Sequence, residues 1–76
     1  MPTDPLPDWV PAARQAIGDR VRAVRTERQI SQERLGELTG LDRKTINRIE
    51  QGTHATLIDH LLVIADVLGT PLRDLV

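Results

Sequence analysis

The residues best suited to chemistry lie between positions 42 and 52, where hydrogen-bonding side chains recur at helical spacing. Five of them would lie on the outward face of one short helix: Arg43, Lys44, Thr45, Asn47 and Arg48. Guanidinium, ammonium, hydroxyl and amide groups bind the base edges and phosphates of duplex DNA. The segment therefore predicts a DNA-contacting surface; the alternative is the polar outer face of an ordinary helical hairpin.

No other group of residues indicates catalysis or a bound metal. His54 and His60 are the only imidazoles and there is no cysteine, whereas metal sites need three or four convergent ligands. Ser31 lacks the His and Asp partners of a catalytic nucleophile, and no glycine-rich phosphate loop is present. We expect a protein that is not an enzyme and that needs no metal or cofactor.

Length and composition limit the chain to one small domain with an aliphatic core. It has 76 residues, and Trp9 is its only aromatic residue. Ligand pockets and single-stranded nucleic-acid platforms usually have aromatic walls, so their absence argues mildly against both. The N-terminus lacks the basic and apolar regions of a signal peptide, and no stretch is long enough to span a membrane. We expect a soluble, cytoplasmic protein with no membrane partner.

The charge is unevenly distributed along the chain. The net charge is −1, but residues 12–52 hold nine basic and six acidic side chains, a balance of +3. Residues 1–11 and residues 53–76 each carry a balance of −2. A local basic region is what phosphate contact requires, although a solvated surface of mixed charge would have the same composition.

The elements that would position this surface are helices. Residues 1–10 are rich in Pro and Asp and predict a flexible arm, so the folded domain is expected over 11–76. The apolar spacing of Ile17, Val21 and Val24 predicts a first helix that begins near Pro11 or near Ile17.

Start and stop signals then mark two short helices with a tight turn. Ser31 is a good N-cap for a helix over 32–39, and Asp42 for a helix over 43–51. Gly40 permits the positive φ of a sharp turn, and Gly36 permits close approach of the third helix. Three residues, 39–41, join the two helices, as in DNA-binding helix-turn-helix units. Leu35, Leu38, Ile46 and Ile49 are expected to face inward.

The remainder predicts two more helices and completes an all-α, five-helix fold. Thr56 and Asp59 resemble a capping box for a fourth helix that ends before Gly69. Its expected inward residues are Ile58, Leu61, Leu62, Ala65 and Leu68. A last short helix would begin at Pro71.

The stretch SQERLGELTGLDRKTINRIEQG closely resembles the helix-turn-helix of the phage-repressor and Cro-like family, also called the XRE family. The preceding IGDRVRAVRTERQI resembles that family's first helix, and LIDHLLVIADVLGTPLRDLV its fourth and fifth. The resemblance spans about residues 17–76 and implies a lambda-repressor-like DNA-binding domain, with the helix over 43–51 as the recognition helix of a repressor-like transcriptional regulator.

The resemblance also implies roles for single residues. Gln32 would bind a phosphate at the start of the second helix, and Arg43, Lys44 and Arg48 would face base edges in the major groove. Thr45 and Asn47 would add base or phosphate contacts, and Gln51 and Thr53 would lie near the opposite phosphate strand. Arg25 and Glu50 match a buried ion pair between the first and third helices of related repressors.

Two partners are expected, double-stranded DNA and a second copy of the chain. Family members commonly dimerise through their C-terminal helices, and five apolar residues there could form an exposed patch: Val63, Val67, Leu72, Leu75 and Val76. Alternatively, the last helix folds back on its own core and the chain stays monomeric. A further alternative function is a protein-interaction module, such as an antitoxin or an accessory subunit.

Overall fold

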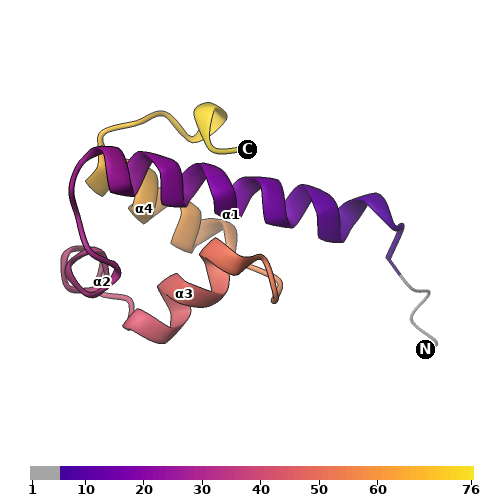
Figure 1. Ribbon diagram of the computed structural model, residues 1–76, viewed down its shortest axis with the longest axis horizontal. Helices are drawn as coiled ribbons and strands as arrows, with labels where there is room; N and C mark the ends of the chain where they lie inside the picture. The colour runs from indigo at the N-terminus through magenta and orange to yellow at the C-terminus, as the bar shows by residue number, and fades with distance from the viewer. Residues whose placement is uncertain (1–5) are drawn as a thin grey trace.

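The computed structural model describes residues 6–76, which form four α-helices and one 3-10 turn (Figure 1). The helices are α1 (Trp9–Glu27), α2 (Gln32–Thr39), α3 (Arg43–Gln51) and α4 (Ile58–Leu68), and the turn is η1 (Leu72–Asp74). No strand occurs within the described residues. The all-α prediction is confirmed, but the expected fifth helix is only this three-residue turn.

Helix α1 begins earlier than the periodicity predicted, at Trp9 rather than near Pro11 or Ile17. Pro11 lies in its first turn, where a missing backbone N–H breaks no helical hydrogen bond. Trp9 and Val10 of the predicted arm therefore belong to the helix, and residues 1–5 of that arm lie outside the described residues. Figure 1 shows the first turns of α1 projecting beyond the other helices.

Gly18 is where α1 and α3 approach each other. It is buried, and a Cβ atom there would lie 2.5 Å from the carbonyl oxygen of Glu50. Since the obstructing atom belongs to the backbone, a side chain could fit only if the two helices moved apart. This close approach brings the end of α3 against α1.

The core is aliphatic, as the composition predicted, and every helix contributes to it. The side chains with almost no exposed surface are Val21, Leu35, Ile46, Ile64, Leu68 and Leu75. Burying a side chain of this size contributes about 1.5–3 kcal/mol to folding. Helices α1 and α2 contact α3 on its buried side, and the other side of α3 lies in solvent.

Some predicted inward residues are exposed. Leu38, Ile58 and Leu62 expose 44%, 55% and 48% of their surface. In α4 the buried stripe is Leu61, Ile64, Ala65 and Leu68, an i, i+3, i+4, i+7 set that includes the overlooked Ile64. The predicted capping box is also wrong: Leu57 occupies the N-cap position of α4, and no side chain caps the helix.

The C-terminal residues fold back on the chain's own core. Leu75 is completely buried, and Leu72 and Val67 pack partly against the same core. The prediction of an exposed apolar patch is therefore wrong for Leu75. Val63 and Val76 remain exposed.

Candidate nucleic-acid interface

Helices α2 and α3 form the helix-turn-helix, and side-chain caps define both starts. The Ser31 hydroxyl accepts a hydrogen bond from the backbone N–H of Arg34 at 2.9 Å, and the Asp42 carboxylate accepts one from Thr45 at 2.7 Å. Gly40 ends α2 in the left-handed region with φ 78°. The caps and the turn follow the sequence prediction because each depends on local residues.

Asp42 lies at the positive end of α3, and its surroundings favour the charged carboxylate. Hydrogen bonding to the side chain and then to the backbone N–H of Thr45 lowers the pKa of Asp42. The positive charges of Lys44 and Arg48 act weakly in the same direction. The ionised carboxylate therefore stabilises the first turn of α3 at neutral pH.

Gly36 sets the distance between α2 and the start of α3. It is buried, and a Cβ atom there would lie 2.7 Å from the carbonyl oxygen of Leu41, in the turn that leads into α3. The predicted close approach thus occurs at the turn and the first residues of α3. This contact fixes the angle between α2 and α3.

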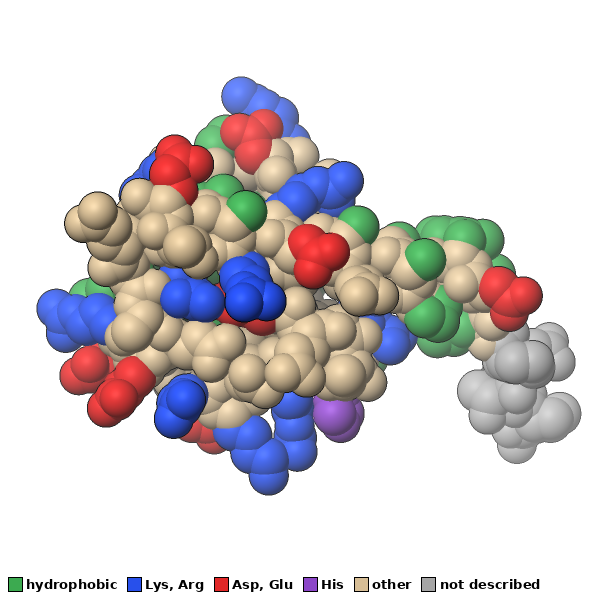
Figure 2. Space-filling model, in the orientation of Figure 1, with side chains coloured by type: hydrophobic (Ala, Val, Ile, Leu, Met, Phe, Trp, Pro, Cys, Tyr) green, Lys and Arg blue, Asp and Glu red, His purple; other side chains and the backbone are tan. Residues whose placement is uncertain are grey.

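Helix α3 has two sharply different sides. Ile46, Ile49 and Glu50 are buried, whereas Thr45 and Asn47 are half-buried. The exposed residues are Arg43, Lys44, Arg48 and Gln51. In Figure 2, Lys and Arg side chains project from the edge of the molecule where Figure 1 places α3.

An ion pair ties α1 to the inner side of α3. Nε of Arg25 donates to Oε2 of Glu50 at 2.6 Å, and Nη2 donates to Oε1 at 3.0 Å. The Glu50 side chain is only 2% exposed. The hydrogen bonds from Arg25 to Glu50 raise the pKa of Arg25 above its usual value, although burial acts in the opposite direction. Nη1 of Arg25 also donates to the Ile30 carbonyl, which secures the segment between α1 and α2.

Gln32 and Asn47 extend this pair into a polar network. Nε2 of Gln32 donates to Oε1 of Glu50 at 3.1 Å, and Nδ2 of Asn47 donates to Oε1 of Gln32 at 3.4 Å. The network borders a polar hollow of about 180 Å³. It is lined by Arg22, Arg25, Gln32, Asn47, Glu50 and Gln51.

Sequence reasoning missed two features of this hollow. Arg22 was not assigned a role, although its i, i+3 spacing to Arg25 on α1 is a signal that the two share one face. Gln32 was expected to contact only phosphate, yet one of its N–H groups bonds Glu50. A second Nε2 hydrogen remains for an external acceptor.

The segment after α3 borders a second hollow. The Thr53 hydroxyl lies 2.9 Å from Nδ1 of His54, and both residues are exposed. The hollow beside it, about 230 Å³, is lined in part by Thr45, Arg48 and the two histidines. Within residues 6–76 no three His, Asp or Glu side chains are grouped closely enough to bind a metal ion.

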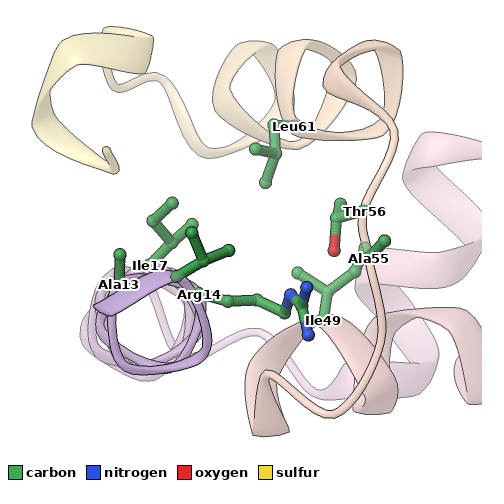
Figure 3. Close-up of a pocket in the computed structure, with 8 residues that line it drawn as sticks. Ala13, Arg14, Ile17, Ile49, Ala55, Thr56 and Leu61 are labelled. Atoms are coloured by element: carbon green, nitrogen blue, oxygen red, sulfur yellow. The ribbon is translucent and has the colours of Figure 1, made fainter. Parts of the chain in front are cut away.

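A third hollow is apolar and lies between α1 and α4. Its volume is about 280 Å³, and its lining includes Val10, Ala13, Ile17, Ile49 and Leu61. Figure 3 shows Ala13 and Ile17 facing Leu61, with Ala55 and Thr56 closing one side. It offers few polar groups, so it does not belong to the charged surface of α3.

None of the helices in the described part of the chain is long and apolar enough to cross a membrane.

Comparison with known proteins agrees with this geometry. The family model described as helix-turn-helix matches residues 21–75, so the chain belongs to that family, the XRE type of helix-turn-helix protein. Its members bind double-stranded DNA, and the chain is a DNA-binding transcriptional regulator. No curated protein matched the sequence.

Solved structures of regulators share the fold. The restriction-modification controller protein C.AhdI from Aeromonas hydrophila is 34% identical, with a TM-score of 0.82 over 86% of this chain and 98% of that chain. Two structures of the clp gene regulator ClgR from Corynebacterium glutamicum are 21% and 20% identical. The first has a TM-score of 0.78 and covers 95% of this chain and 86% of its own. The second has a TM-score of 0.79 and covers 96% of this chain and 71% of its own. Both show the shared fold.

Proposed function

We propose that the chain recognises a specific duplex sequence by placing α3 in the major groove, as a repressor-like regulator. The observation that carries this proposal is the two-sided α3, whose buried residues fix it to the core while its cationic and amide side chains face solvent. Arginine and lysine pair with guanine O6 and N7 in this position. The residues assigned to the groove are Arg43, Lys44, Thr45, Asn47 and Arg48.

Phosphate contacts would set the register of α3 on the duplex. The polar hollow supports this role because it brings Gln32, the first residue of α2, together with Gln51 of α3 and the exposed cation of Arg22 on α1. Helix N-termini and side-chain amides are common phosphate donors. Thr53, exposed after α3, is assigned to the other strand.

Selection from a random duplex pool tests the function directly. The wild-type chain should enrich one consensus, and its affinity should fall steeply with salt as phosphate counterions are released. Recovery of no consensus, together with capture of a protein partner, would instead favour the interaction-module alternative. We propose no catalytic role for the chain. Because its proposed ligand is DNA, we expect the protein to be cytoplasmic.

We further propose that two copies bind one operator. A two-fold dimer would place recognition helices in successive major grooves, about 34 Å apart. The exposed apolar surface of α4 and the C-terminus supports this proposal: Leu62, Val63 and Val76 are all exposed. Leu62→Lys should give a monomer by sedimentation, whereas Leu38→Lys on α2, at a similarly exposed position, should leave the dimer intact. A wild-type monomer at high concentration would contradict the dimer.

The likeness to a restriction-modification controller supports a narrower role. At 34% identity over most of both chains, we propose that this chain also controls transcription of restriction-modification genes beside its own. The selected consensus should then occur upstream of such genes. Its absence from the neighbouring promoters would reject this role without affecting DNA binding.

A further inference from the structure

We infer that Glu50, acting through Gln32, fixes the side-chain amide of Asn47 in the orientation that reads an adenine in the major groove. The inference rests on the proposed function, in which α3 enters the groove. It assigns Asn47 as the specificity-determining residue for one base pair, and Gln32 and Glu50 as positioning residues.

The first step is the buried carboxylate of Glu50. It is 4% exposed as a whole residue and accepts two hydrogen bonds from Arg25 and one from Gln32. A carboxylate paired with a guanidinium has only acceptor atoms to offer. Any neighbouring amide must therefore present its NH₂ group to Glu50.

The second step is the amide of Gln32, which has one donor end and one acceptor end. With Nε2 committed to Glu50, its Oε1 must face the other way, toward α3. A 180° flip would set Oε1 against the carboxylate and lose a charge-assisted hydrogen bond, one of the stronger kinds in proteins. Glu50 therefore determines the direction of the Gln32 amide.

The orientation of the Gln32 amide in turn determines the orientation of the Asn47 amide. Because Oε1 of Gln32 is an acceptor, Asn47 must turn its Nδ2 group toward it, at 3.4 Å. All buried side-chain polar atoms among the described residues have a partner in this arrangement. The amide of Asn47 keeps Oδ1 and a second Nδ2 hydrogen unused.

The unused groups of Asn47 have the pattern that adenine requires. Asn47 is half-buried, and Lys44, Arg48 and Gln51 beside it on α3 are exposed. Adenine offers an N6 donor and an N7 acceptor side by side, and asparagine binds both through its oxygen and its NH₂ group. An amide held in one orientation binds this pair without first losing its freedom to flip.

The experiment compares base preferences, selected from random duplexes, for the wild type, Asn47→Ala and Gln32→Met. Methionine keeps the length of Gln32 without its amide, and the Arg25–Glu50 pair remains. The wild type should select adenine at one position. In Asn47→Ala the preference for adenine over the other bases should fall by about tenfold. In Gln32→Met most of this preference should be lost. The base preferences at the other positions should not change in either variant. Replacing the selected adenine by purine or 7-deazaadenine should weaken binding by the wild type but not by Asn47→Ala.

The outcomes separate this inference from the proposed function. The control Glu33→Gln, in the same turn of α2, should keep the adenine preference whatever its overall affinity. Uniformly weaker binding by folded Gln32→Met, with the preference retained, would overturn the inference and leave Gln32 as a phosphate contact. A wild-type consensus with no position sensitive to Asn47→Ala would also overturn it. No wild-type consensus at all would reject the proposed function itself.

Discussion

Helices α3 and α4 are similar in length, nine and eleven residues, yet they present opposite surfaces to solvent. The outer side of α3 is basic and polar, with Arg43, Lys44 and Arg48 exposed. The outer side of α4 carries Leu62 and Val63. Both helices bury aliphatic residues against the same core, so the solvent side is what distinguishes a DNA-facing helix from one suited to protein contact.

Their inner sides differ as well. Helix α4 buries only apolar residues, whereas α3 buries Glu50 within a network of hydrogen bonds. A buried charge is tolerated only when it is paired, and Arg25 of α1 provides the pair. The position of α3 therefore depends on an ion pair as well as on packing. Helix α4 is held by packing and by one hydrogen bond, from Nε of Arg28 to the Leu68 carbonyl at 3.0 Å.

The largest expected effect comes from breaking this ion pair. Glu50→Ala leaves the guanidinium of Arg25 without its partner in a part-buried site, and we expect a loss of about 3–5 kcal/mol in unfolding free energy. Urea denaturation measures it. A loss below 1 kcal/mol would show that Arg25 is readily rehydrated. Glu50→Gln, which keeps one acceptor oxygen, should lose less.

The matching change in α4 removes packing instead of charge. Ile64→Ala opens a cavity in the fully buried core and should cost about 2–5 kcal/mol by the same measurement. Val63→Ala on the exposed side of α4 is the control and should change stability little. Equal effects of the two substitutions would contradict the assigned register of α4.

The N-termini of the two helices provide a third comparison. Asp42 caps α3, but Leu57 at the N-cap of α4 has no capping side chain. Leu57 is exposed and extended, and the backbone N–H of His60 already donates to its carbonyl, so serine there could accept from the backbone N–H of Asp59. Leu57→Ser should raise stability by about 1 kcal/mol, seen as a higher melting temperature. Leu57→Ala should give no such gain, and a gain shared by both variants would rule out capping as its cause.

The smallest expected effect is a pH dependence confined to α3. Because the pKa of Asp42 is lowered in the folded state, its contribution is complete above the unfolded pKa of about 3.9. It disappears as pH falls through the lower folded value. Asp42→Asn keeps a capping oxygen that does not titrate, so its melting temperature should fall less between pH 5 and pH 2. Identical profiles for both proteins would contradict the lowered pKa.

Local signals predicted the helix-turn-helix closely, and tertiary contacts explain most of the misses. Ser31, Asp42 and Gly40 act on their own turns, so their roles were visible in the sequence. The burial of Ile64 and Leu75 depends on which helices pack against them, and Gly18 shows its purpose only when α3 lies beside it. The bond from Gln32 to Glu50 joins residues eighteen positions apart, which no local pattern reveals.

The exposed side of α3 is expected to bind duplex DNA, and one paired measurement tests this most directly. Arg43→Ala with Arg48→Ala should weaken binding to the selected duplex by about 30-fold or more. The control, Arg20→Ala with Arg73→Ala, removes two exposed arginines from α1 and η1 and should retain most of the affinity. If both pairs of substitutions weakened binding equally, the interaction would be a general electrostatic attraction and not recognition by α3. Unchanged binding by the α3 pair would contradict the assignment of α3 as the recognition helix.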